Sequence, residues 1–141
     1  MINDSNKKQI IIISVLGSSG VALGALGAHF LKAKMQSGII TADHLAGFET
    51  AVKYQMYHTL AMMLLIVFNA HGSSKFFGWA YAFFFWGIIL FSGSLYFLCT
   101  RNLFGADWLK FLGPVTPIGG ICFIIGWLCL IPAVLKKDKA A

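Results

Sequence analysis

Charged side chains are scarce in this sequence. Only 11% of its 141 residues are Asp, Glu, Lys or Arg, whereas 58% are hydrophobic. Soluble domains carry about 25% charged and 45–50% apolar residues. So few charges cannot cover the surface of a water-soluble fold of this size. The composition therefore excludes an ordinary soluble enzyme, a disordered chain and a coiled coil, and it indicates one membrane-embedded domain over residues 1–141.

Cysteine and acidic residues are also few. The chain has three cysteines without a C-x-x-C spacing, and five acidic residues against 11 lysines and arginines. The sequence therefore predicts no metal site, no cofactor and no catalytic residue. Its net charge of +6 does not indicate nucleic-acid binding, because the cations flank apolar runs instead of forming one patch. We expect these cations to contact lipid head groups.

The few charges divide the chain into long uncharged gaps. The gaps cover residues 9–31, 54–74, 76–100 and 111–135. A bilayer-spanning helix needs about 20 apolar residues, and it satisfies its own backbone hydrogen bonds, as lipid requires. The sequence therefore predicts an all-α membrane protein with four transmembrane helices in an up-down bundle. We place these helices near residues 9–31, 54–70, 76–100 and 111–135.

The lysines and the single arginine predict an orientation. With four spans, the two termini and the middle loop share one membrane face. That face carries Lys7, Lys8, Lys75, Lys136, Lys137 and Lys139, and the other carries Lys32, Lys34, Lys53, Arg101 and Lys110. The terminal lysines are dense and adjacent to their spans. The positive-inside rule then favours both termini in the cytoplasm.

The first predicted span carries four regularly spaced glycines. Gly17, Gly20, Gly24 and Gly27 fall on one side of a helix. In lipid, small residues allow helix backbones to approach closely. We predict that this glycine face packs against another helix of the same chain, and an oligomer seam is the alternative.

The connection before the second span has an amphipathic pattern. The Thr41 hydroxyl can cap a helix. After it, Leu45 and Phe48 recur at helical spacing, while Glu49 and Lys53 are polar. The pattern predicts an amphipathic segment over residues 41–53, which either lies at the membrane interface or runs straight into the second span.

Polar side chains gather at corresponding points of several spans. In the second span Gln55, His58 and Thr59 share one helical face, and in the third span Ser92 and Tyr96 do the same. Such groups bond across helices at roughly 0.6–2 kcal/mol each. The predicted polar cluster comprises His29, Glu49, Tyr54, Gln55, His58, Thr59, Ser92, Ser94, Tyr96 and Thr116.

Two histidines are the candidates for chemistry within this cluster. His29 ends the first predicted span and His58 begins the second, so we expect them at the same membrane face. Together with Glu49 they could bind a metal or relay a proton. The alternative is that both are structural, bonded to a hydroxyl or a carbonyl group.

The start of the fourth predicted span contains helix-breaking residues. Pro114, Pro117, Gly119 and Gly120 follow one another closely. Proline lacks a backbone donor and clashes with the preceding turn. We predict a broken or kinked helix here, and an ordinary helix N-terminus with proline in its first turn is the alternative.

Four motifs in this order resemble a known family. They are LGALGAH at 23–29, YQMYHTLA at 54–61, FSGSLY at 91–96 and TPIGG at 116–120. The chain resembles, over residues 17–135, the small bacterial membrane proteins of domain-of-unknown-function family 423. The resemblance implies a four-helix protein of the bacterial inner membrane without an assigned reaction, and it carries over no catalytic residue.

The sequence thus favours a structural or accessory helical bundle rather than an enzyme. Such a bundle would pack against lipid, against itself as a homo-oligomer, or against a larger membrane complex. One alternative is transport of a small solute or a proton along the polar cluster. A second alternative is a haem- or metal-binding bundle.

Overall fold

The structure is a computed structural model that describes residues 4–71 and 74–135, and all regular elements in these residues are helical. They are α1 (Asp4–Leu26), η1 (Gly27–Leu31), α2 (Lys32–Gln36), α3 (Ala42–His71), α4 (Lys75–Gly87), η2 (Ile88–Ser92), α5 (Gly93–Thr100), η3 (Arg101–Phe104), η4 (Asp107–Leu112), α6 (Val115–Leu128) and α7 (Leu130–Leu135).

These elements form four rods, each long and apolar enough to cross a membrane. We call them the first to fourth spans: Asn6–Gln36, Ala42–Asn69, Lys75–Phe104 and Asp107–Leu135. The four-span all-α architecture predicted from the charge gaps is confirmed.

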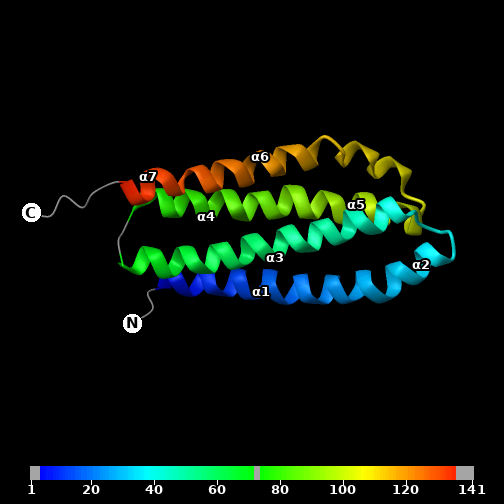
Figure 1. Cartoon of the computed structure of the whole chain (residues 1–141), viewed down its shortest axis with the longest axis horizontal. Coiled ribbons are helices and arrows are strands. Elements are labelled where there is room, and N and C mark those ends of the chain that lie inside the picture. Colours follow the sequence, from blue (N-terminus) through cyan, green and yellow to red (C-terminus); the bar gives the residue numbers. More distant parts are fainter. Residues whose placement is uncertain (1–3, 72–73, 136–141) are drawn as a thin grey trace, which may run out of the picture.

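The four spans lie side by side in chain order. The main contacts join α1 to α3, α3 to the α4–η2–α5 rod, and that rod to α6 (Figure 1). The beginning of α1 and the end of α7 lie at the same end of the molecule (Figure 1). The two outer spans are the least buried: 22% of the most apolar stretch of each is buried, against 39% and 33% in the second and third spans.

Helix α3 begins with a reciprocal cap. The backbone N–H of His44 donates to the Thr41 hydroxyl at 3.2 Å, and the backbone N–H of Thr41 donates to His44 Nδ1 at 3.3 Å. This arrangement satisfies two donors at the helix start, as a capping box does. The turn before it contains Gly38 at a φ of 76°, a backbone conformation that favours glycine.

The structure contains no separate amphipathic helix between the first two spans within the described residues. Residues 42–53 form the first turns of α3, which continues without a break to His71. Glu49 and Lys53 are exposed on its outer side, so they do not interrupt the helix. The second span is therefore longer than the predicted 54–70, because charged residues bound the apolar stretch and not the helix.

The fourth span is also interrupted at a different place from the predicted one. Regular α-helix begins at Val115, after Pro114 at the N-cap, and it continues through Pro117, Gly119 and Gly120. Proline costs little in the first turn, because the backbone N–H groups there have no partner within the helix. The predicted break is therefore wrong beyond Pro114, and the alternative, a helix N-terminus with proline in its first turn, describes this segment.

The break in this span lies between α6 and α7, at Cys129. Pro132 follows three residues later and has no backbone N–H to offer to the carbonyl of residue 128. The predicted span of residues 111–135 has no break at this position.

The glycine face of α1 packs against α3. A Cβ placed on Gly24 would lie 3.4 Å from Val52, and one on Gly27 would lie 3.2 Å from the Phe48 ring. Gly20 faces Met56 and Gly17 faces Thr59 in the same register. The contacts of the four glycines therefore describe one register between the first two spans of the same chain.

Glycines also join α4 to α6, in a reciprocal arrangement. The Phe123 ring of α6 lies against Gly87, and the Phe84 ring of α4 lies against Gly126. Both rings are buried. Each helix thus offers a ring to a glycine of the other, which brings the two helices close together.

Two apolar clusters fill the interior at different depths. The larger includes Met62 and Leu65 of α3, and the smaller includes Leu45 and Phe48 of the same helix. Between them, residues 51–59 of α3 contribute three of the five buried polar side chains in the described part of the chain, namely Gln55, His58 and Thr59. The region between the two apolar clusters, where these polar side chains lie, is the candidate functional site.

Candidate functional site

Gln55 links three of the four spans. Its amide nitrogen donates to the carbonyl oxygen of Leu16 at 2.8 Å and to the Ser19 hydroxyl at 3.0 Å. Its amide oxygen accepts a hydrogen bond of 2.8 Å from the Tyr96 hydroxyl. Since Gln55 is only 3% exposed, these bonds lie inside the bundle and satisfy both ends of its amide.

Two serines connect the third span to its neighbours. The fully buried Ser92 hydroxyl donates to the carbonyl oxygen of Ala51 at 2.8 Å. The Ser94 hydroxyl lies 2.7 Å from the Thr116 hydroxyl of α6 and 3.0 Å from the carbonyl oxygen of Phe91. Ser92 and Ser94 therefore extend the network from α3 to the fourth span.

His58 has a partner at each ring nitrogen. Nδ1 lies 2.8 Å from the carbonyl oxygen of Tyr54, and Nε2 lies 3.2 Å from the indole nitrogen of Trp127. A carbonyl only accepts and an indole N–H only donates. These partners therefore require a neutral imidazole with its proton on Nδ1. The ring also stacks on Phe123, with centroids 3.6 Å apart.

We call this network the polar layer. It consists of Ser19, Gln55, His58, Thr59, Ser92, Ser94, Tyr96 and Thr116, and its bonds reach all four spans. Thr59 belongs to it through a 2.6 Å bond to the carbonyl oxygen of Gln55. Seven residues of the predicted cluster thus come together in the structure, and Ser19 joins them.

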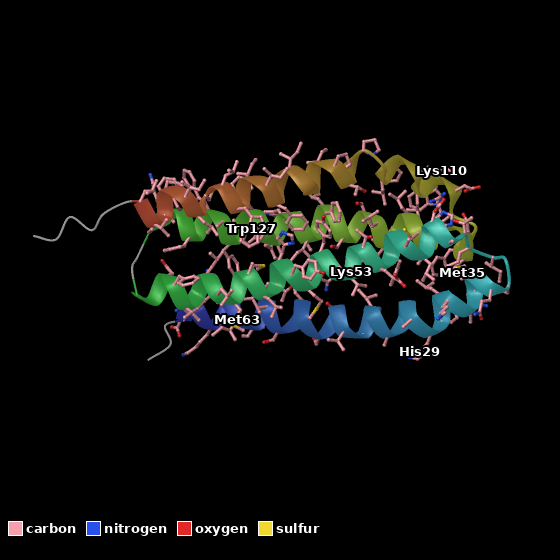
Figure 2. The ribbon with its side chains drawn as sticks, in the orientation of Figure 1. His29, Met35, Lys53, Met63, Lys110 and Trp127 are labelled. Carbon is pink, nitrogen blue, oxygen red and sulfur yellow. The ribbon has the colours of Figure 1, made fainter. Side chains whose placement is uncertain are left out.

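His29 and Glu49 do not belong to the polar layer. Both are exposed, and His29 projects from the outer edge of the first span, away from the other spans (Figure 2). The adjacent Gly27 packs against Phe48, ten residues before His58. Ten residues of helix correspond to about 15 Å.

The expected juxtaposition of the two histidines is therefore wrong. It assumed that the second helix starts at residue 54, whereas His58 lies near the middle of α3. No group of three His, Cys, Asp or Glu side chains that could hold a metal ion occurs in the described part of the chain.

Tyr54 lies beside the polar layer and lines a lateral groove. Its half-exposed ring stacks on Phe91, with centroids 4.7 Å apart. The groove has a volume of about 680 Å³ and lies between α3 and α6. We call it the aromatic groove. Its lining comprises Tyr54, Tyr57, His58 and Phe91, together with six residues of α6 between Pro117 and Trp127.

Trp127 and Phe123 are site residues in the structure that were not among the predicted ones. Trp127 points from α6 toward the inner spans (Figure 2). A usable signal was present, because an indole N–H within an apolar span needs an acceptor. The second span offers several such acceptors, including Gln55, His58 and Thr59, so the sequence alone does not identify the partner.

A family comparison places the chain among known membrane proteins. The model of a protein family of unknown function, DUF423, matches residues 23–120. The chain belongs to this family. The resemblance inferred from the four sequence motifs is therefore confirmed.

Named relatives agree with this assignment. A UPF0382 membrane protein of Staphylococcus aureus is 42% identical over 130 residues, which cover 92% of this chain and 97% of the relative. The UPF0382 inner membrane protein YgdD of Escherichia coli K12 is 36% identical over 136 residues, with coverage of 96% and 95%. No solved structure matches the chain. The DUF423 chain is thus a small multi-pass protein of the bacterial inner membrane that contacts lipid.

Proposed function

We propose that this DUF423 protein is a structural or accessory subunit without enzymatic activity. Its four spans act as one preformed body that packs against a larger complex of the inner membrane. The observation that carries the proposal is the closed polar layer. It is closed in the sense that each of its cross-helix hydrogen bonds ends on a side chain or carbonyl of the same chain. A groove of about 440 Å³ borders it at Ser19, Gln55, Ser94 and Tyr96.

Buried polar atoms support this view. Within the described residues, the buried side-chain nitrogen and oxygen atoms without a hydrogen-bond partner are Ser74 Oγ and Arg101 Nε. Ser74 precedes α4 and Arg101 begins η3, so both lie near the ends of the third span. The middle of the bundle therefore has a satisfied network, which stiffens a fold and specifies one packing.

Transport along the polar layer has less support. A solute or a proton would have to displace hydrogen bonds such as that from the Ser92 hydroxyl to the Ala51 carbonyl oxygen. Ser92 is fully buried. A haem or metal function at the histidines has less support too, because His58 already uses both ring nitrogens and His29 lies elsewhere.

The proposal is tested by native mass spectrometry of the tagged protein, extracted gently from its own membrane. We expect a defined complex with another membrane protein. A stable monomer without any partner would contradict the accessory role. Proton or solute flux in reconstituted vesicles above that of protein-free vesicles would favour transport instead.

We also propose that both termini face the cytoplasm. Lys7, Lys8 and Lys75 lie at the end of the bundle where α1 begins and α7 ends. The test is an Asp4→Cys variant in which Cys99, Cys122 and Cys129 are replaced by alanine. Labelling of this cysteine by an impermeant reagent from outside the cell would reverse the orientation.

A further inference from the structure

Helix α3 carries two charged side chains at a depth where the other spans carry none. In the described chain, the other charged side chains of the spans lie within the first or last five residues of a span. Glu49 and Lys53 lie farther in, and both are exposed. Figure 2 shows Lys53 partway along the bundle, between the labelled Met63 and Met35. An ionisable side chain inside a span is costly, and it therefore points to a function.

The glycine contacts of α1 give the depth of these two charges. Gly20 is the central residue of the uncharged stretch 9–31 of the first span, and it faces Met56 of α3. Lys53 precedes Met56 by three residues and Glu49 precedes it by seven. At the rise of an α-helix they lie about 5 Å and about 10 Å from the middle of the bilayer. Since the hydrocarbon extends about 15 Å to each side of the middle, both charges lie within it.

Neither charge has an ion-pair partner in the described part of the chain. The ion pairs there lie at the start of α1 and in η4. A pair formed between Glu49 and Lys53 on the same helix would still face hydrocarbon, where no water solvates it. A second protein surface that brings a carboxylate and an ammonium group to this level covers both charges and neutralises them.

The two charges belong to a continuous exposed stripe on α3. Its members recur every three or four residues, so they share one side of the helix. We call it the α3 stripe, and it consists of Ala46, Glu49, Lys53, Tyr57, Leu60 and Leu64, all of which are exposed. From its first to its last member it rises about 27 Å, close to the roughly 30 Å of hydrocarbon. Such spacing is the one with which parallel helices pack along their length.

We propose that the α3 stripe is the interface between two copies of this chain. Two copies that are inserted the same way and related by a twofold axis present the same surface to each other. A helical side chain leans toward the helix N-terminus. The flexible lysine stem can therefore cross the rise of about 6 Å between Lys53 and the level of Glu49. The ammonium group of Lys53 in each copy then meets the carboxylate of Glu49 of the partner subunit.

The charges of the α3 stripe favour a second copy over other occupants. An acid and a base on adjacent turns make the stripe complementary to itself, so the two cross-pairs neutralise every charge of the interface. A lipid acyl chain brings no charge to this depth. A helix of an unrelated protein would need both charges in the matching register, whereas a second copy carries them by symmetry.

Two complementary charge variants test this interface. Glu49→Lys gives the stripe two bases, and Lys53→Glu gives it two acids. Neither variant can form the ion pair within its own helix, and each repels a second copy of itself. The two variants are purified with different tags, mixed in detergent and reconstituted, and native mass spectrometry measures the share of dimers that carry both tags.

We expect several-fold more mixed dimers from the two variants than from wild-type chains with the same two tags, which mix at random. A matched control moves the same charge changes to an exposed pair outside the stripe. Asp107→Lys and Lys110→Glu should mix at random, because these residues lie at the start of the fourth span.

Cysteine cross-linking keeps the proposal testable if the charge variants fail to insert. Leu60 lies on the α3 stripe and Trp86 lies on the third span outside it, and they are 60% and 55% exposed. Leu60→Cys and Trp86→Cys are oxidised in native membranes, in a background where Cys99, Cys122 and Cys129 are replaced by alanine. Disulfide-linked dimers of the chain should form several-fold faster with Leu60→Cys.

Three outcomes overturn the proposal. They are random mixing of the two charge variants, equal rates of cross-linking in the two cysteine variants, and a cross-link from Leu60→Cys to a different protein only. The last outcome would make the α3 stripe a docking surface for that protein. The mixing experiment uses this chain alone, whereas the accessory role requires another protein, so this inference and the proposed function fail separately.

Discussion

Both halves of the molecule use glycine to bring helices together, but the glycines face different neighbours. In the first half, a Cβ on Gly20 would meet the Sδ atom of Met56 at 2.6 Å. In the second half, a Cβ on Gly119 would overlap the backbone of Phe91. A thioether can swing aside, but a helix backbone cannot. The comparison indicates that the neighbouring group, and not the glycine spacing, determines how strongly a glycine-to-alanine substitution destabilises the fold.

The largest effect is expected at Gly119. In the Gly119→Ala variant the new methyl group overlaps the backbone nitrogen and Cα of Phe91, so α6 must move away from η2. We expect a loss of about 3 kcal/mol in the free energy of unfolding, at the upper end of overpacking effects. Detergent-induced unfolding followed by circular dichroism measures it.

Gly120→Ala is the matched control for this variant. A Cβ at Gly120 would lie 3.9 Å from the Phe91 ring, which is ordinary contact. If the two alanine variants unfold at the same denaturant concentration, close backbone approach does not hold the second half together.

The next effect is expected at Gly126. A Cβ there would lie 2.6 Å from two ring atoms of Phe84, which is fully buried. Gly126→Ala should cost about 2 kcal/mol by overpacking. Adding Phe84→Leu removes the ring, so the double variant should be more stable than the sum of the two single losses predicts. Simple additivity would show that the ring and this glycine do not interact.

A smaller effect is expected in the polar layer, where the two halves meet. Tyr96→Phe removes the donor to the Gln55 amide oxygen. Cross-helix hydrogen bonds in membranes contribute roughly 0.6–2 kcal/mol, and we expect a loss of about 1 kcal/mol. Tyr57→Phe removes a hydroxyl outside the polar layer and should leave the unfolding free energy unchanged. Equal losses of unfolding free energy in Tyr96→Phe and Tyr57→Phe would contradict the assignment of Tyr96 to the polar layer.

The smallest effect is expected in the first half. Gly20→Ala should cost less than about 1 kcal/mol, because the end of Met56 can change rotamer. The loss should shrink in a Met56→Ala background, where the close contact that remains is the buried Gln55 amide nitrogen at 3.3 Å. Gly17→Ala should cost nothing, since its nearest new contact is 3.9 Å away. Thermal unfolding measures these variants beside Gly119→Ala. Equal losses of stability in Gly20→Ala and Gly119→Ala would refute the comparison.

The sequence predicts the number and approximate position of the spans, because a charge inside lipid is costly and the uncharged gaps are long. It predicts a cap at Thr41, but it leaves open whether the segment after this cap lies at the interface or runs into the second span. Glu49 and Lys53 bound the apolar stretch of the second span, yet α3 begins earlier, at the cap formed by Thr41 and His44. A helix continues as long as its backbone N–H and C=O groups find hydrogen-bond partners. It can therefore extend beyond the hydrocarbon core of the membrane.

The candidate site was predictable in its residue types but not in its partners. The spacing of Gln55, Thr59 and Ser92 indicates inward-facing groups. Two of their partners are the backbone carbonyl oxygens of Leu16 and Ala51. Every residue has a backbone carbonyl, so the residue types in a sequence do not indicate which one accepts.

The sequence does not predict the register between the spans either. His29 and His58 seemed equivalent by their distance from the predicted membrane boundary. The glycine contacts of α1 place Gly27 beside Phe48 and Gly17 beside Thr59, and this register separates the two histidines. Packing between specific side chains therefore sets the height of one helix relative to another, and membrane boundaries do not.

Hydrogen–deuterium exchange in phospholipid nanodiscs tests the central claim most directly, namely that the polar layer is closed. The account predicts that the backbone amides of residues 51–59 exchange as slowly as those of residues 61–66, which lie in an apolar cluster of the same helix. Fast exchange confined to residues 51–59 would place water inside the layer, contradict the closed structural bundle and favour a transport path.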